Sequence, residues 1–372
     1  MKTLIVGLLI FSVFFSIGLL LARHKPLWDD ELWEQQMSVQ DTSWLKIISG
    51  HTVDWNNFPL YHALQKAFMQ MIHWKLPFAL DGTWFVVHPQ AQLVMRLLPD
   101  FLVSIAMTAI VLFFGFRSGF VPGLATLLIC LSMPMVWVYW VEARSYSLWF
   151  MLTVFQSLLF LDTAARKESQ APRGLFLLTF CGLCLTAPLG ILQTIVCQGL
   201  LWCAGIKGRK FYLVTGAVPL FLGAYYFILR DKMGMFPGVP WPSLFFDNFP
   251  MEELVFLSGY VIFLLLLRAS LPSVSLGCAF LPFCFVFIVI SFIGIFYVVS
   301  KSVPHAAPVV SRHFIFLTPV SIIMTAAIFS DLWQAAAKRF WWSSGVLIIF
   351  ASGLLSQALS VFISVNRLGV YF

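Results

Sequence analysis

Long apolar segments dominate the sequence, and they constrain the fold more than any other feature. A helix needs about 20 mostly apolar residues to cross the hydrocarbon core of a bilayer. A hydropathy window identifies eleven apolar segments of roughly that length. They are 3–22, 97–116, 119–138, 145–163, 174–188, 189–205, 211–229, 254–270, 276–299, 313–333 and 342–364. The turn-forming run 186–190 separates two of them, so 174–205 is either two helices or one bent helix. We therefore predict an all-α polytopic membrane protein with about eleven transmembrane helices.

The composition excludes several other classes of protein. Hydrophobic residues make up 60% of the chain and charged residues 10%, and the mean hydropathy is +0.90. A soluble domain carries about 45–50% apolar and about 25% charged residues. A soluble enzyme, a disordered chain, a secreted disulfide scaffold and a soluble nucleic-acid-binding protein are therefore excluded. All seven cysteines fall within apolar segments, so Cys181 and Cys184 are interpreted as packing residues and not as a redox or zinc motif.

The basic residues predict an orientation. If the N-terminus is cytoplasmic, the inner side carries eleven basic and three acidic residues, and 13 of the 16 acids lie outside. This is the positive-inside asymmetry. The first apolar run exceeds the length of a typical signal-peptide core, and no small-x-small site precedes Arg23, so it is predicted to be an uncleaved anchor. The expected location is a bacterial cytoplasmic membrane.

The outer loop 23–96 holds most of the polar chemistry. It contains six tryptophans, which prefer the membrane–water interface, and a dense group of acids after residue 28. We expect one helix from about Asp30 to Ile48 and a second after Pro59, both lying in the interface. In the second helix an apolar stripe alternates with a polar one at helical spacing. The stripes are Leu60, Leu64, Phe68 and Met71 against His62, Lys66, Gln70 and His73.

Further polar residues stand at the outer ends of predicted spans, where they are expected to line one outward-facing cavity. Five such segments follow one another along the chain: Trp28-Asp29-Asp30-Glu31-Leu32-Trp33, Pro59-Leu60-Tyr61, Arg96-Leu97-Leu98-Pro99, Glu142-Ala143-Arg144-Ser145-Tyr146 and Arg312-His313-Phe314. The set resembles that of GT-C membrane glycosyltransferases of family 39, which includes protein O-mannosyltransferases and aminoarabinose transferases. The resemblance covers residues 25–200 well and 300–320 loosely.

Two segments depart from the family pattern. Relatives often carry His-Pro-Pro-Leu-Tyr where this chain has Asn57-Phe58-Pro59, and Thr-His-Tyr where it has Thr186-Ala187-Pro188. Because these histidines are absent, the resemblance does not imply the same contacts with substrate as in those relatives.

The resemblance implies a GT-C-like bundle with a catalytic module at 1–230, formed by the first seven spans and the loop 23–96. Residues 231–372 then supply the helices that complete the cavity. It implies transfer of a sugar from a polyprenyl-phosphate donor to an acceptor hydroxyl on the extracytoplasmic side, with inversion. The expected catalytic acids are Asp30, paired with Glu31, and Asp29 as the rival base; repulsion between neighbouring acids would raise the pKa of one of them. The expected substrate- and phosphate-binding residues are Arg144, Glu142, Tyr146, Arg96, Arg312, Lys301 and Tyr61.

No resident cofactor is predicted, and a metal is left open, because carboxylates with waters can hold Mg²⁺ or Mn²⁺. The expected partners are the lipid-linked donor, a glycan, lipid or protein acceptor, and the bilayer, without nucleic acid.

Two alternative functions stay open. One is a transporter or flippase of lipid-linked sugars, which the gathering of charge at one face and the lack of an internal repeat disfavour. The other is a non-catalytic subunit of an envelope glycan assembly complex.

Overall fold

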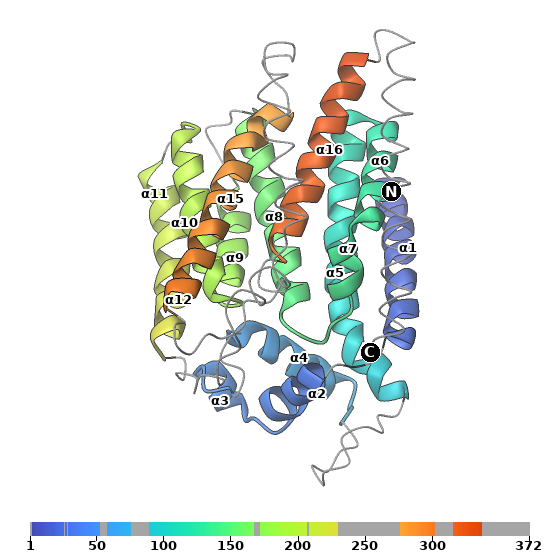
Figure 1. Ribbon diagram of the computed structural model, residues 1–372, viewed down its shortest axis with the longest axis vertical. Coiled ribbons are helices and arrows are strands. Elements are labelled where there is room, and N and C mark those ends of the chain that lie inside the picture. The colour runs from blue at the N-terminus through green and yellow to red at the C-terminus, as the bar shows by residue number, and fades with distance from the viewer. Residues whose placement is uncertain are drawn as a thin grey trace.

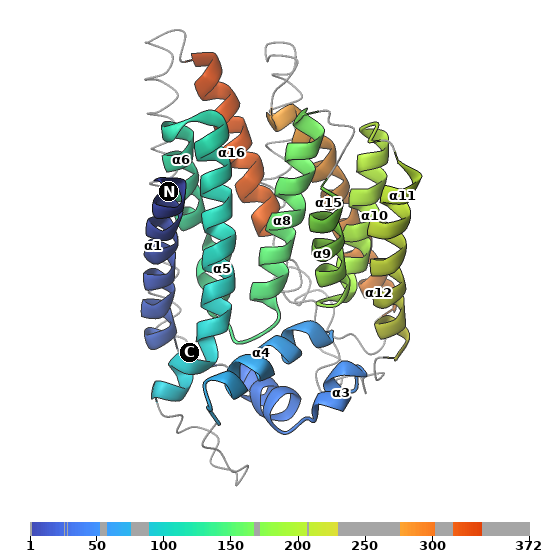
Figure 2. The same ribbon diagram turned by 180° about the vertical axis from the view of Figure 1, so that it is seen from behind.

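A computed structural model describes residues 2–25, 27, 29–52, 58–75, 89–166, 172–206, 208–229, 276–301 and 315–336. Every regular element within these residues is a helix. The long helices run side by side as one bundle, and a layer of short helices covers one end of it (Figures 1 and 2). The predicted all-α architecture is confirmed for the part of the chain described.

Five of the described helical stretches are long and apolar enough to cross a membrane. They are α1 (Lys2–His24), α5 (Pro89–Ser118), α8 (Tyr146–Arg166), the continuous stretch α11 (Arg209–Tyr212), η2 (Leu213–Ala217) and α12 (Val218–Leu229), and α16 (Leu317–Ala336). Shorter apolar helices accompany them: α6 (Phe120–Ser132), α9 (Arg173–Cys184), α10 (Pro188–Cys203), and the first part of α15 (Leu276–Lys301). By their length and composition, these helices are consistent with a helical membrane protein. The predicted number of eleven spans is not confirmed, because the predicted segments 254–270 and 342–364 lie outside the described residues.

The third predicted segment, 119–138, is divided between two helices. The helix α6 ends before Met133, and the chain restarts at Pro134 as α7 (Pro134–Tyr139). A proline at the first position begins a helix easily but cannot continue one, which explains the break.

Close helix packing in the bundle depends on glycines. A Cβ on Gly123 of α6 would lie 2.8 Å from the Cα of Gly115 in α5. A Cβ on Gly190 of α10 would lie 2.1 Å from the carbonyl oxygen of Leu183 in α9. Small residues of this kind let membrane helices approach closely. The region 174–205 is two antiparallel helices joined by a turn at 185–187, which settles the alternative that the sequence left open.

The two ends of the bundle differ in chemistry. The end that holds the N-terminus of α1 also holds the α5–α6 connection, where Arg117 donates to Asp162 of α8 at 2.6 Å (Figure 1). Asp331 of α16 accepts the backbone N–H groups of Leu276 and Gly277 there, at 2.9 and 2.8 Å, and so caps α15. The short helices cover the opposite end. The segments predicted to face the inner side and those predicted to face the outer side therefore lie at opposite ends of the bundle.

The short helices are α2 (Asp29–Trp33), η1 (Glu34–Gln40), α3 (Trp44–Ile48) and α4 (Pro59–Met71). We call them the outer helices, or the outer layer, after the orientation that the sequence predicts. The prediction of one helix from Asp30 to Ile48 is wrong, because the chain widens into a π-helix at Glu34 and stops at Asp41. Ser43 then begins a new helix by accepting the backbone N–H of Lys46 at 3.3 Å. The second predicted helix is confirmed, with Pro59 at its first turn.

The helix α4 turns polar residues toward the protein. His62, Gln65 and Lys66 are buried, whereas Leu64 and Met71 are exposed. An apolar exposed face suits a helix that lies in the membrane interface, as the sequence predicts. The buried polar face is the one that meets the bundle and builds the site described next.

Candidate functional site

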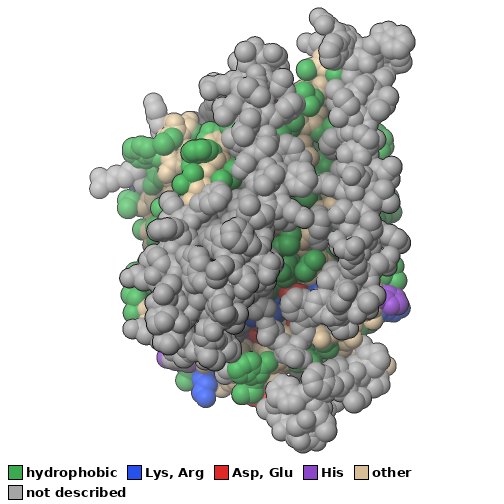
Figure 3. Space-filling model, in the orientation of Figure 1, with side chains coloured by type: hydrophobic (Ala, Val, Ile, Leu, Met, Phe, Trp, Pro, Cys, Tyr) green, Lys and Arg blue, Asp and Glu red, His purple; other side chains and the backbone are tan. Residues whose placement is uncertain are grey.

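A cluster of charged side chains lies where the outer helices meet the bundle. We call it the charged cluster; its members are Glu31, Glu34, His62, Arg96 and Arg144. Acidic and basic side chains are visible together at this level in the space-filling view (Figure 3). All five are buried, although charges are costly to bury unless they are paired.

The pair of Glu31 and Arg96 joins the outer layer to α5. Arg96 donates from Nη2 to Glu31 Oε2 at 2.7 Å and from Nε to Oε1 at 3.1 Å, and neither side chain is exposed. The Nη1 group of Arg96 donates to the carbonyls of Ala22 and Lys25 at the end of α1. Glu31 Oε1 also accepts the backbone N–H of Ala143 at 2.7 Å. One carboxylate thus connects three segments distant in sequence.

The pKa of Glu31 lies below its ordinary value. Burial alone would raise this pKa, but the charge and hydrogen bonds of Arg96, with the charge of Lys25, outweigh it. Glu31 is therefore a carboxylate at neutral pH, and both of its oxygens are engaged. Such a group holds its neighbours in place and is poorly suited to take a proton.

Glu34 forms the second part of the charged cluster. Its Oε2 accepts from Arg144 Nε at 2.9 Å, and its Oε1 lies 3.1 Å from His62 Nε2. The guanidinium of Arg144 stands 5.3 Å from the ring centroid of Tyr146, within range of a cation–π contact. Sequence reasoning omitted Glu34 and His62 from the site. The spacing of Glu31 and Glu34, three residues apart and so on one helical face, could have indicated the second acid.

Glu142 is held beside the charged cluster by Lys25. Lys25 Nζ lies 3.3 Å from Glu142 Oε1 and also donates to the carbonyl of Val138. The pKa of Glu142 is raised, because burial and the charge of Glu31 outweigh the favourable charge of Lys25. Lys25 is a third residue that sequence reasoning omitted from the site.

Tyr61 is fully buried next to these acids. Burial raises its pKa well above the ordinary value, and the charges of Glu34 and Glu31 raise it further. The backbone before Tyr61 pairs with the α9–α10 turn: Phe58 N–H donates to the Thr186 carbonyl at 3.1 Å, and Leu60 N–H to that of Leu185 at 3.0 Å. Phe58 and Thr186, which belong to the two segments that differ from the GT-C pattern, therefore lie against each other.

Some buried polar atoms around the charged cluster have no hydrogen-bond partner among the described residues. They include His62 Nδ1, Gln65 Oε1 and Glu142 Oε2. Native proteins leave few buried polar groups unsatisfied, so each such atom requires a ligand, a water or another residue as its partner. Their position on the inner face of α4 and on the 139–146 segment marks this region as the place where a bound group would be held.

Four predicted site residues cannot be compared in full. Asp29 and Asp30 contribute their backbone to α2, and Lys301 ends α15, but their side chains are outside the described part; Arg312 is outside it altogether. The predicted residues with described side chains are Glu31, Tyr61, Arg96, Glu142, Arg144 and Tyr146, and all six lie in or directly beside the charged cluster.

A divalent cation has no ready ligand set within the described part of the chain. No group of three or more His, Cys, Asp or Glu side chains is placed there to hold a metal ion. Glu31 and Glu34 are engaged by arginines. Any Mg²⁺ or Mn²⁺ at this site would therefore need oxygen ligands in addition to Glu31 and Glu34.

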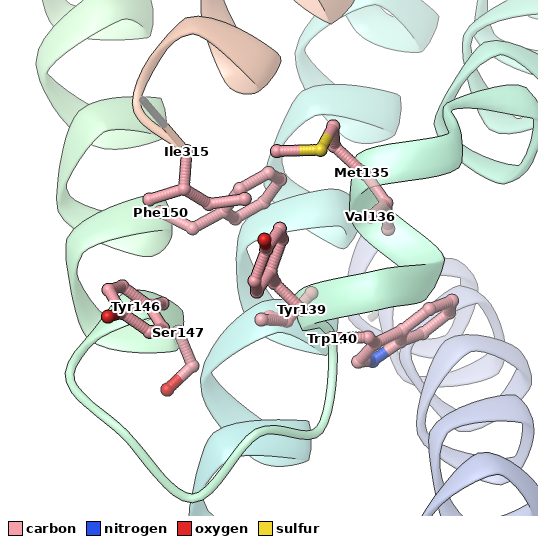
Figure 4. A pocket seen from close by; sticks show the side chains of 9 residues that line it. Met135, Val136, Tyr139, Trp140, Tyr146, Ser147, Phe150 and Ile315 are labelled. Carbon is pink, nitrogen blue, oxygen red and sulfur yellow. The ribbon is translucent and has the colours of Figure 1, made fainter. Parts of the chain in front are cut away.

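A small apolar pocket lies behind the 139–146 turn (Figure 4). Tyr139, Trp140 and Tyr146 line it together with Phe150 of α8 and Ile315 just before α16. Its volume is about 10 Å³, room for about one water molecule. Tyr139 and Tyr146 meet edge to face with ring centroids 5.8 Å apart. This packing fixes the turn that carries Glu142 and Arg144.

Comparison with known proteins identifies no relative: no protein-family model matches the chain, and no curated protein matches it.

Proposed function

We propose that this protein is a membrane glycosyltransferase that moves a sugar from a polyprenyl phosphate to an acceptor hydroxyl, with inversion, on the extracytoplasmic side of the membrane. One observation carries the proposal. Residues from the acidic segment at 28–33, the start of α5 and the 142–146 segment converge on one buried charged cluster where the outer helices meet the bundle. A phosphate headgroup whose prenyl chain lies in the bilayer is confined to that depth.

Glu31 and Arg96 are positioning residues in this scheme. Their bidentate pair is fully buried, and it fixes α2 against α5 and Ala143. The role of general base therefore falls to Asp30 or Asp29, which stand next to Glu31 on α2. Fixing α2 matters because catalysis of this kind depends on holding the base and the attacking oxygen in place.

Arg144 is the candidate for the leaving phosphate. Glu34 and the Tyr146 ring orient its guanidinium, and the arginine fork matches phosphate oxygens. In the reaction, Asp30 or Asp29 takes the proton of the acceptor hydroxyl. The acceptor oxygen forms a bond to the anomeric carbon, the bond from that carbon to the phosphate oxygen breaks, and the lipid phosphate leaves with the additional negative charge.

The proposal is tested in cells by mass spectrometry of polyprenyl-phosphate sugars and envelope glycans. The strains are wild type, a deletion, and the deletion complemented with Asp30→Asn, Asp29→Asn or both. We expect the deletion and at least one variant to accumulate one lipid-phosphate sugar and to lack one decoration. Asp162→Asn is the matched control, because Asp162 pairs with Arg117 at the opposite end of the bundle, away from the charged cluster. Normal profiles in the deletion and in the double variant would contradict the proposal.

An assay with purified protein separates a transferase from a transporter or a scaffold. The protein in detergent is incubated with a short-chain polyprenyl-phosphate sugar from the accumulating strain and with envelope glycan from the deletion strain. A transferase releases the polyprenyl phosphate in an amount equal to the sugar transferred. A transporter or a non-catalytic subunit releases none.

A further inference from the structure

A second cavity lies within the outer layer, between η1 and the end of α4. Its volume is about 380 Å³, which falls in the range of small-ligand sites. Every residue that lines it belongs to 35–40 or 66–75. The described residues of the spanning helices therefore do not contribute to it, and none of its described lining residues belongs to the charged cluster.

The lining combines apolar, amide and cationic groups. Val39, Met69 and Trp74 supply apolar surface, and the side chains of Gln35, Gln40 and Gln70 supply amides. An aromatic ring beside amide groups suits a sugar, because the amides can donate to and accept from hydroxyls while the ring packs against C–H groups. The indole Nε1 of Trp74 is buried and has no partner among the described residues. It is a donor that a bound ligand would satisfy.

The charge of the cavity is positive. Lys66, His73 and Lys75 line it, and none of the lining residues within the described part of the chain carries a carboxylate. Lys66 donates to the carbonyls of Val39 and Gln40 at 2.7 and 3.2 Å, which holds the ammonium at the wall. The exposed Asp41 is the acid that acts on it: burial lowers the pKa of Lys66, and the Asp41 charge raises it in part. An anionic ligand would therefore meet two lysines.

The cavity and the charged cluster are neighbours on the same helical faces. Gln35 lines the cavity and donates to the carbonyl of Ala143 at 2.8 Å, directly before Arg144. Lys66 follows His62 by one turn of α4, and His62 contacts Glu34. Residues four apart on a helix are about 5–6 Å apart. A ligand in the cavity therefore lies close enough to reach the charged cluster with its next unit.

We propose that this cavity binds the acceptor, and that the acceptor is an acidic saccharide, with a carboxylate or a phosphate that pairs with Lys66 and Lys75. This identification rests on the proposed transferase function. The prenyl chain of a donor must lie among spanning helices, which this cavity lacks, so the cavity suits the water-soluble substrate. The hydroxyl to be glycosylated would belong to the sugar unit next to the one held in the cavity.

The test is a binding experiment on the full chain in detergent, labelled with 5-fluorotryptophan, with Trp74→Phe identifying the Trp74 fluorine resonance. The probes are a galacturonic acid trimer, glucose 6-phosphate and the neutral maltotriose. We expect the Trp74 resonance to shift on titration with one or both acidic probes. The acidic probe that binds more tightly identifies the anionic group of the acceptor as a carboxylate or a phosphate. Since a charge-assisted hydrogen bond is lost, Lys75→Gln is expected to weaken that binding about tenfold, and Lys66→Gln by at least as much.

Lys46→Gln is the matched control, because Lys46 is an exposed lysine of the same layer that does not line the cavity. It should leave the affinity unchanged. Lys75 is exposed, so its replacement tests the site without a risk to folding. Maltotriose binding as tight as the acidic probes, or a Trp74 resonance that no probe moves, would overturn the proposal.

This experiment contains no donor, so its outcome is separate from that of the transferase proposal. Acid-selective binding without any release of polyprenyl phosphate would retain the saccharide site and reject the transferase. Sugar transfer to a neutral acceptor with a silent Trp74 would retain the transferase and reject the acidic acceptor.

Discussion

The carboxylate of Asp100 in α5 accepts a hydrogen bond from the indole of Trp140 at 3.0 Å and another from Ser104 at 3.1 Å. Trp140 stands two residues before Glu142, so this contact connects the interior of the bundle to the turn at the charged cluster. Both residues are buried. We expect Asp100→Leu to lower the free energy of unfolding by about 2 kcal/mol, because it leaves two buried donors without an acceptor. Asp100→Asn keeps an acceptor oxygen, so it should have a smaller effect in thermal unfolding of the purified protein. Equal losses in the two variants would show that the hydrogen bonds are not what matters.

Gly18 of α1 faces that same carboxylate, and a Cβ at Gly18 would lie 1.8 Å from Asp100 Oδ1. We expect Gly18→Ala to destabilise the protein by about 1–3 kcal/mol, because the Asp100 carboxyl must move away from its hydrogen bonds with Trp140 and Ser104 to accept the methyl group. Gly199→Ala serves as the control, since nothing lies within 4 Å of a Cβ there. The measurement is the midpoint of thermal unfolding in detergent. A Gly18→Ala midpoint equal to that of Gly199→Ala would contradict the packing described.

Replacing one member of the Glu31–Arg96 pair should lower the free energy of unfolding more than replacing both. Either Glu31→Leu or Arg96→Leu leaves one buried charge without its partner, and we expect a loss of about 3–5 kcal/mol. The double variant leaves neither charge and should recover part of that loss. A double-mutant cycle of unfolding free energies measures the coupling. Additive losses would mean that the two side chains do not interact across the 2.7 Å contact.

The pH dependence of stability should separate Glu31 from Glu142. The pKa of Glu31 is lowered on folding, so its contribution is present above the ordinary value of 4.5 and is lost as the pH falls through the lowered pKa. The pKa of Glu142 is raised, so its contribution is present below 4.5 and is lost as the pH rises through the raised pKa. Unfolding of wild type, Glu31→Gln and Glu142→Gln between pH 3 and 8 tests both signs.

We expect Glu142→Gln to gain stability relative to wild type as the pH rises above 4.5, and Glu31→Gln to lose its deficit as the pH falls below it. The slope of the difference with pH is the informative quantity, because either substitution also removes hydrogen bonds. A Glu142→Gln difference that shrinks with rising pH would contradict the raised pKa.

Hydropathy predicted most of the described fold, because a spanning helix is recognised from the length and the composition of its segment alone. It did not predict the break between η1 and α3, since Thr42 and Ser43 are compatible with a polar face of one helix and act as a boundary only through local hydrogen bonds. Glu34 and His62 were missed for a different reason. The three-residue spacing from Glu31 could have indicated Glu34, but the contacts of Glu34 with His62 and Arg144 join positions 28 and 110 residues apart, which no spacing rule on one helix connects.

The outer layer is fastened at both sides of the bundle. Glu31 ties it to Arg96 and Ala143, while Phe58 and Leu60 tie it by their backbone to the α9–α10 turn. A further hydrogen bond of 2.6 Å runs from the Tyr226 hydroxyl of α12 to the carbonyl of Ile48. The layer therefore cannot swing away as a hinged lid without breaking buried ion pairs at one side and backbone hydrogen bonds at the other. For the proposed transferase, we therefore expect the lipid-linked donor to reach the charged cluster from the side. It would diffuse in the plane of the bilayer and enter between helices while the outer layer stays in place.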